Sequence, residues 1–197
     1  MTSAPFSRSL LLLAGLLAGC TAAPAQLSLA CVPTEADAMG PFYIAGTPVV
    51  DDLNRHGKVG DPLLLTGRIL SAAEGHAPIA DARIEIWQTD GDGDYHPAAN
   101  GDYADYADEA IDLRGTVISD QEGRYAVKTL APGGYFPRPR HFHVRITAEG
   151  QAPLVTQLYI TGDGVVRQPG GDCRHATLED TTDGLRYQAP DIFLVGK

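Results

Sequence analysis

Short apolar runs alternate with clusters of Gly, Pro and Asp through most of the chain. The runs are rich in β-branched and aromatic residues and are bounded by turn formers, which is the pattern of β-strands. No long stretch carries helical periodicity, and regularly spaced short strands are typical of a β-sandwich. We therefore predict an all-β fold, a β-sandwich with long active-site loops. The predicted strands cover residues 63–70, 82–87, 115–119, 125–129, 141–147 and 154–160.

The composition agrees with a folded β domain. The 197 residues include 22 Gly and 14 Pro, and 44% are hydrophobic against 20% charged. At ~150 residues per domain, this length allows one domain, and the composition is too apolar for a disordered chain. The net charge is −10, without a run of Lys or Arg. Because nucleic-acid binding needs clustered cations, no nucleic-acid partner is expected.

The N-terminal region has the features of an export signal. Residues 9–19 form an apolar run that is too short to cross a bilayer of ~30 Å as a stable helix. The run ends before Cys20 in a Leu-Ala-Gly-Cys sequence that resembles a bacterial lipobox. We predict a lipoprotein signal peptide over 1–19, lipidation of Cys20, and a location on the periplasmic or cell-surface side, with the membrane contacted only through the lipid. An ordinary secretory peptide and a short buried helix are the alternatives.

The residues after the lipobox predict a tether and then the folded domain. Residues 20–35 are rich in Ala, Pro and Thr and read as a flexible tether, so the domain is expected over 36–197. Cys31 and Cys173 remain as an even pair, and an oxidising compartment permits a disulfide between them. Two separate buried thiols are the alternative.

A His-x-His pair is the most informative local motif. In a strand, His141 and His143 point to one face, with ~7 Å between positions two residues apart, while Phe142 faces the core. Alone, such a pair is a weak sign of a metal. Tyr135 precedes it on a Pro-Gly turn, and Tyr95 ends an Asp-rich loop. Phenolate oxygens with imidazoles suit Fe(III), whereas zinc has less need of phenolates.

The long polar segment 90–112 is expected to be a loop carried by the sheets. Its start, Asp90-Gly91-Asp92-Gly93-Asp94, looks like a calcium loop. Such a loop requires a bidentate Glu at its twelfth position, where Gly101 stands. The aspartates are therefore expected to shape and solvate the loop.

Several separated motifs together resemble those of the intradiol ring-cleavage dioxygenases, the family that includes protocatechuate 3,4-dioxygenase and catechol 1,2-dioxygenase. The similarity covers roughly residues 36–165 in the family's order. The motifs are Gly40-Pro41-Phe42-Tyr43, Leu63 to Gly67, Ile84 to Gln88 with Gly93 to Tyr95, Leu113-Arg114-Gly115, Asp120 to Tyr125, the Pro-Gly-x-Tyr and His-x-His block, and Thr156-Gln157-Leu158-Tyr159.

The resemblance implies a mechanism and a set of site residues. It implies that a non-haem Fe(III) opens a catechol between its two hydroxylated carbons with O2, giving a cis,cis-muconate-type product. The implied iron ligands are Tyr95, Tyr135, His141 and His143. Tyr135 is also implied as the proton acceptor. Other implied site residues are Arg138 for catalysis and substrate binding, Gln157 of the Thr-Gln-Leu-Tyr strand as a catalytic residue behind the metal ligands, and Tyr43 in the substrate pocket.

The chain departs from the family's soluble enzymes at one place. Tyr135 and Arg138 stand close together, and Arg140 replaces a small residue before the histidines. This compact spacing resembles exported, single-domain members, which lack the N-terminal helical domain used for dimerisation. A homo-oligomer is therefore left open. The alternative functions are a non-catalytic exported β-sandwich binding module and a zinc or copper site that uses the two histidines and a carboxylate.

Overall fold

The structure, a computed structural model, describes residues 1, 31–162 and 171–197. Apart from Met1, the predicted signal peptide lies outside these residues, as does Cys20. No helix in the described part of the chain is long and apolar enough to cross a membrane.

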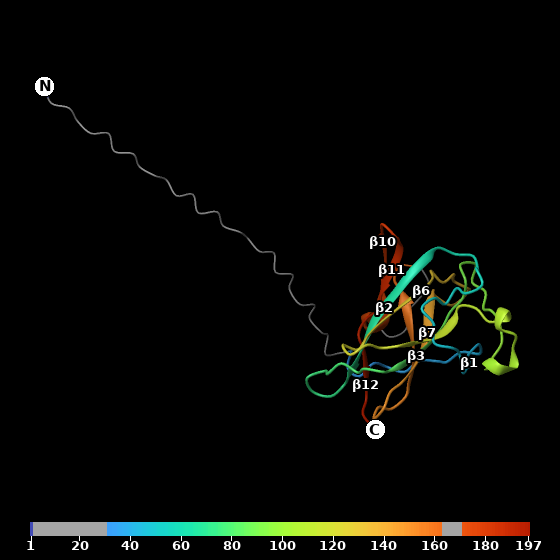
Figure 1. The fold of residues 1–197 in the computed structure, drawn as a ribbon, viewed down its shortest axis with the longest axis horizontal. Coiled ribbons are helices and arrows are strands. Elements are labelled where there is room, and N and C mark those ends of the chain that lie inside the picture. The colour runs from blue at the N-terminus through green and yellow to red at the C-terminus, as the bar shows by residue number, and fades with distance from the viewer. Residues whose placement is uncertain (2–30, 163–170) are drawn as a thin grey trace.

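Two five-stranded sheets pack face to face, which confirms the predicted all-β sandwich (Figure 1). The first sheet has the order β10-β11-β2-β12, with β6 also paired to β2. The second has the order β5-β3-β7-β8-β9, and β1 and β4 form a small parallel pair. The strand bounds are β1 Ile44–Ala45, β2 Pro62–Ser71, β3 Arg83–Trp87, β4 Gly101–Asp102, β5 Arg114–Ile118, β6 Arg124–Leu130, β7 His141–Thr147, β8 Leu154–Ile160, β9 His175–Ala176, β10 Leu178–Thr181, β11 Gly184–Gln188 and β12 Ile192–Leu194.

Alternating residues of the two sheets form one apolar core. Leu65 and Ile69 of β2 face Ile84 of β3 and Phe142 and Val144 of β7, and all five side chains are fully buried. Burying one side chain of this size stabilises the fold by about 1.5–3 kcal/mol. The opposite faces of β3 and β7 are thereby directed outward, where polar side chains lie.

All six predicted strands are present, but the strands near the C-terminus were not predicted. β10, β11 and β12 are short, and β10 reads Leu-Glu-Asp-Thr. β11 and β12 run parallel to β2, which lies more than a hundred residues earlier in the chain. Such strands are formed by long-range pairing, so their own sequence carries little signal.

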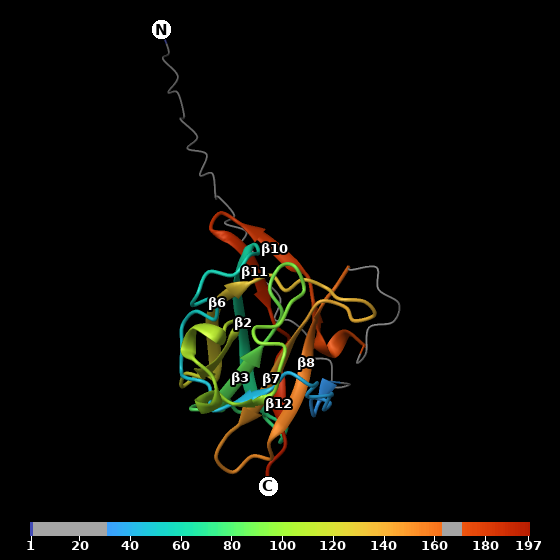
Figure 2. The same cartoon turned by 90° about the vertical axis from the view of Figure 1, so that its right-hand side faces the viewer.

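The polar segment 90–112 projects from the sandwich, as predicted for a loop (yellow-green in Figures 1 and 2). It contains β4 and two short 3-10 helices, η2 Tyr103–Asp105 and η3 Asp108–Ala110. Arg55 ties it to the body through a bond of 2.8 Å from its guanidinium to Asp108. The loop therefore has a defined shape although its sequence is polar.

The first described segment, residues 31–40, which we call the N-terminal strap, lies beside β8 (blue in Figure 2). A disulfide joins Cys31 to Cys173, and the backbone of Thr34 donates to Phe193 at 3.1 Å. Residues 31–35, which composition assigned to the tether, are thus joined to the folded body by a disulfide and a hydrogen bond. Side-chain pairing and the crosslink hold residues that a Pro-rich sequence by itself would leave free.

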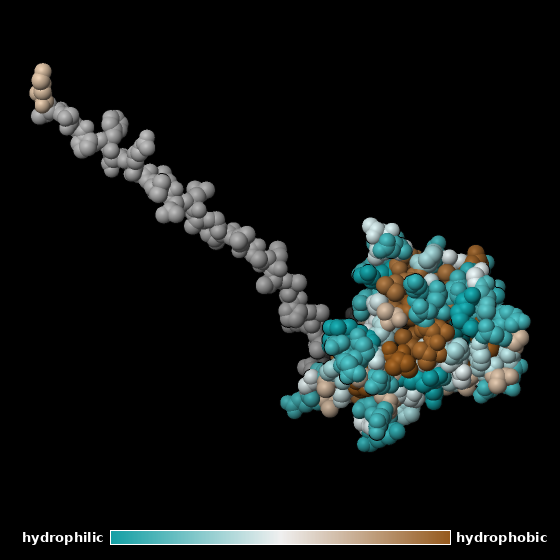
Figure 3. All heavy atoms as spheres, viewed as in Figure 1, coloured by the Kyte–Doolittle hydropathy of each residue, from teal (hydrophilic) through white to brown (hydrophobic). Residues whose placement is uncertain are grey.

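The face of the molecule in Figure 3 is largely hydrophilic, with one apolar area near its middle. A separate pocket on the first sheet is lined by residues of β2, β6 and β11, including Leu64, Lys128 and Arg186. This pocket contains none of the sequence-predicted site residues.

Candidate metal centre

The candidate site is built on a row of side chains across the outer face of the second sheet. Strand register places Arg114 opposite Trp87, Trp87 opposite His143, and His143 opposite Gln157. Because paired positions in adjacent strands share a face, these four side chains form one row. His141 lies one step along β7 on the same face, opposite Tyr159 of β8.

The two histidines direct nitrogen atoms at the same point. Nε2 of His141 lies 3.0 Å from Nε2 of His143, and both residues are 3% exposed. Nδ1 of His141 donates to the carbonyl of Pro139 at 2.6 Å, which leaves the lone pair of its Nε2 free. The indole of Trp87 stacks on His143 with an interplanar angle of 4°.

Burial keeps both imidazoles neutral. It lowers the pKa of His141 to about 4, with a smaller opposing effect from its bond to Pro139. Burial also lowers the pKa of His143 to about 3, and His141 and Arg138 contribute in the same direction. Neutral imidazole is the form that binds a metal ion, so the pair is ready to do so at neutral pH.

Two tyrosines complete the cluster from loops above the sheet. The ring of Tyr135 lies 6.0 Å from that of His141, and the ring of Tyr95 lies 6.3 Å from that of His143. The two phenol rings are 6.1 Å apart. Burial raises the pKa of Tyr95 well above its usual range, and the neighbouring Tyr135 raises it further. The four residues named from the sequence therefore lie together.

Glycines allow the two tyrosine-bearing loops to touch. A Cβ added to Gly133 would lie 2.4 Å from the carbonyl oxygen of Gly91, and one added to Gly93 would lie 2.8 Å from that of Gly134. Gly93 also has a φ of +96°, which side-chain-bearing residues rarely adopt. The close backbone approach brings Tyr95 and Tyr135 over the same patch of sheet.

Arg114 supports Tyr95 from below. Its side chain is 1% exposed and donates to the carbonyls of Phe42, His96 and Pro97. The guanidinium carbon lies 5.6 Å from the centre of the Tyr95 ring. Burial lowers the pKa of Arg114 to about 10, and Tyr95 opposes that shift. A protonated guanidinium at this position donates hydrogen bonds to three carbonyl groups and contacts a phenol ring.

Arg138 lies beside the cluster, but Tyr43 does not. Arg138 donates to Oε1 of Gln157, whose Nε2 donates to the carbonyl of Ala38 at 2.7 Å. The hydroxyl of Tyr43 instead donates to Glu85 at 2.9 Å, and its ring lies 5.0 Å from that of Trp87. Tyr43 thus borders the row through Trp87 and has no described contact with the four donors.

Two buried polar atoms of the cluster, the hydroxyl of Tyr95 and Nδ1 of His143, have no hydrogen-bond partner among the residues that the structure describes. A buried phenol without a partner is costly, and a cation at its oxygen removes that cost. Two phenols and two imidazoles are a hard donor set that fits a ferric ion. Among the described residues, no group of three or more His, Cys, Asp and Glu could hold a metal ion.

Three supporting residues were not assigned a site role from the sequence. Gly40 packs on His143, because an added Cβ would lie 3.1 Å from its imidazole Cε1. Arg114 and Trp87 share the sheet row described above. The motifs that contain Gly40 and Arg114 stood out in the sequence, but only strand register shows which neighbours they serve.

Fold and site together define a β-sandwich protein with a buried cluster of two tyrosines and two histidines on the outer face of one sheet. The family model described as "Dioxygenase" matches residues 38–138, about half of the chain. The chain belongs to the intradiol ring-cleavage dioxygenase family, as its motifs predicted.

Curated relatives agree with this assignment. Catechol 1,2-dioxygenase 2 of Acinetobacter lwoffii is 32% identical over 145 residues, covering 63% of this chain and 50% of the relative. Hydroxyquinol 1,2-dioxygenase of Rhizobium sp. (strain MTP-10005) is 31% identical over 156 residues, covering 68% of this chain and 50% of the relative. The chain thus spans about half the length of these relatives.

Solved structures share the fold. The dioxygenase domain of a carbohydrate-binding fusion protein from Streptomyces sp. SirexAA-E has a TM-score of 0.66 at 23% identity, covering 84% of this chain and 99% of that chain. The intradiol ring-cleavage dioxygenase of Tetranychus urticae has a TM-score of 0.67 at 20% identity, covering 84% and 95%. Both neighbours match nearly their whole length to this sandwich.

Proposed function

We propose that this chain is a non-haem Fe(III) intradiol dioxygenase. In this proposal it opens a catecholic ring between the two hydroxylated carbons with O2 and gives a cis,cis-muconate-type product. One observation carries the proposal: the rings of Tyr95 and Tyr135 lie 6.1 Å apart and within 6.3 Å of the imidazoles of His143 and His141, whose Nε2 atoms are 3.0 Å apart. Family membership supports the same reaction class.

Ferric iron, when bound, supplies the electron-accepting centre that activates a catechol toward O2. The residues supply position and proton transfer. Tyr95 is 7% exposed and held over Arg114, which suits a fixed ligand. Tyr135 is half-buried and stands on a turn closed by a 2.6 Å bond from Arg138 N to Tyr135 O. Its Oη is therefore the better placed of the two phenols to accept a proton from the diphenol.

Arg138 is proposed to stabilise negative charge that develops on the activated ring. Its guanidinium is held by Gln157, which is 0% exposed and fixed in turn by Ala38. A pre-oriented cation in a partly dry site is worth several-fold more than one in water. Replacing Arg138 by Ala is expected to lower turnover more than iron binding.

The test is one absorption spectrum followed by oxygen uptake. Two tyrosinates on Fe(III) give a red-brown charge-transfer band, which neither zinc nor an inert binding module gives. Tyr95→Phe is expected to shift or abolish the band. Tyr106→Phe is the matched control, since its hydroxyl donates to Asn100 O at 2.7 Å, away from the four donors. A colourless iron-loaded protein, or no oxygen uptake on a panel of catechols, would contradict the proposal.

We also propose that the protein is exported and lipid-anchored through Cys20. The lipobox-like sequence before Cys20 supports this, and the Cys31–Cys173 disulfide is of a kind that persists in oxidising compartments. Mass spectrometry of the mature N-terminus is the measurement: a diacylglyceryl-modified Cys20 is expected, and an intact or unlipidated N-terminus would contradict it.

A further inference from the structure

The N-terminal strap touches the candidate site at two places. Gly40 packs on the imidazole of His143, and the carbonyl of Ala38 accepts from Gln157. Its backbone also follows β8, since Asp37 N donates to Val155 O at 2.9 Å. The second half of the strap therefore forms one wall of the site.

Asp37 holds the strap to β8. One of its carboxylate oxygens, Oδ2, accepts from the hydroxyl of Tyr159 at 2.7 Å and from the guanidinium of Arg174, and the other accepts from Ala38 N at 2.7 Å. Tyr159 is 0% exposed and Arg174 is 4% exposed. The carboxylate thus completes a buried cluster in which Arg174 also lies 5.5 Å from the Tyr159 ring centre.

Tyr159 connects this cluster to Gln157. Its hydroxyl lies 3.1 Å from Oε1 of Gln157, the atom that receives Arg138. The orientation of the Gln157 amide is determined by its neighbours, because Ala38 O requires the NH2 group and Arg138 requires the oxygen. The hydroxyl of Tyr159 has one proton and lies closer to Asp37 than to Gln157, so the carboxylate takes that proton and Oε1 of Gln157 is left to accept from Arg138.

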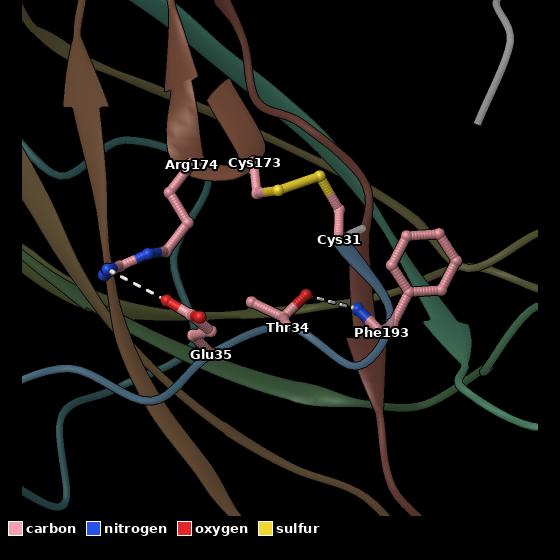
Figure 4. The surroundings of a disulfide bond; sticks show 6 residues. All are labelled: Cys31, Thr34, Glu35, Cys173, Arg174 and Phe193. Carbon is pink, nitrogen blue, oxygen red and sulfur yellow. Dashed lines mark hydrogen bonds and ion pairs between the residues drawn. A yellow bond between two sulfur atoms is a disulfide. The ribbon is translucent and has the colours of Figure 1, made fainter. Parts of the chain in front are cut away.

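The disulfide joins the start of the strap to the residue before Arg174. Arg174 follows Cys173, and Cys31 begins the strap, as Figure 4 shows together with the bond between Thr34 and Phe193. The strap carries a second carboxylate, Glu35, whose Oε2 lies 4.0 Å from Arg174 Nη2. That side chain is 76% exposed and does not contact Tyr159 in the described structure, so it offers a natural comparison with Asp37.

We propose that Asp37 is a positioning residue for Arg138, acting through Tyr159 and Gln157. The catalytic part of this inference rests on the proposed function. Removing the carboxylate frees Tyr159 Oη to donate to Gln157 Oε1, where it competes with Arg138 for that oxygen. Asp37→Leu removes both acceptor oxygens at similar size, whereas the amide of Asn would keep one. Since small displacements of a catalytic group cost one to two orders of magnitude in rate, we expect Asp37→Leu to lower kcat roughly tenfold, with KM changed about twofold at most.

The orientation of Arg138 is measured first, without any activity assay. Phenylglyoxal labels accessible arginines, and peptide mass spectrometry reports the rate at Arg138 in the purified full chain. Asp37→Leu is expected to raise this rate several-fold, and Glu35→Gln is expected to leave it unchanged. Adding Tyr159→Phe to Asp37→Leu removes the competing hydroxyl and is expected to return the rate toward that of wild type, which separates positioning from anchoring of the strap.

The second test measures kcat of the iron-loaded protein in a double-mutant cycle. If Asp37 acts through Arg138, Asp37→Leu lowers kcat in the wild-type background and has no further effect in the Arg138→Ala background. Equal fold losses in both backgrounds, unchanged Arg138 labelling in Asp37→Leu, or no recovery of that labelling when Tyr159→Phe is added would overturn the inference. If wild type lacks turnover but labelling responds as expected, the proposed function fails while the positioning of Arg138 by Asp37 stands.

Discussion

The loss of stability on removing the disulfide can be calculated directly from the separation of its two cysteines in the sequence. Cys31 and Cys173 are separated by 142 residues. The chain-entropy relation for a loop of this length gives a stabilisation of about 5 kcal/mol at 25 °C, because the crosslink restricts the unfolded chain. For a protein of this size, such a loss lowers the Tm by about 10–20 °C. We therefore expect Cys31→Ser/Cys173→Ser to unfold far more readily than the oxidised protein.

Urea denaturation followed by tyrosine and tryptophan fluorescence measures this loss. The serine variant is expected to have a lower midpoint and a somewhat steeper slope, because its unfolded chain is less compact and exposes more surface. Reductant is expected to bring wild type to the midpoint of the variant. Reductant should leave the variant itself unchanged, which makes it the control. A variant that keeps the wild-type midpoint would refute the reasoning, since the crosslink would then not restrict the unfolded ensemble.

Three further perturbations test the loops, the strap and the donor set. Gly133→Ala places a Cβ 2.4 Å from Gly91 O and is expected to cost about 1–3 kcal/mol or more in urea denaturation, whereas Gly134→Ala, with its nearest contact at 3.5 Å, should be nearly neutral; equal losses would argue against the backbone contact. For Asp37, burial favours a higher pKa, but the bonds from Arg174 and Tyr159 outweigh it and hold the pKa below 3.8, so its carboxylate stabilises the fold above that pH. The stability difference between wild type and Asp37→Asn should therefore shrink as pH falls through the native pKa, and a constant difference would contradict this. Chelation of ferric iron is expected to remove colour and turnover together, and Fe(III) should restore both; turnover that survives complete bleaching would exclude iron.

The sequence by itself determined the local features. Alternation along 141–147 placed His141 and His143 on the face opposite Phe142, and the structure has this arrangement because side chains of a strand alternate by geometry alone. The same reasoning predicted the six central strands. Motif resemblance then named the two tyrosines, which the structure brings beside the histidines.

Only the tertiary structure decided which distant residues support these donors. The row from Arg114 to Gln157 depends on the register of four strands, and the contact of Asp37 with Tyr159 depends on where the strap lies after the disulfide closes. β11 and β12 likewise exist through pairing with β2. Alternation is a property of neighbouring residues and can be read from any short segment. Register and loop packing result from contacts between residues far apart in the chain, so no segment encodes them alone.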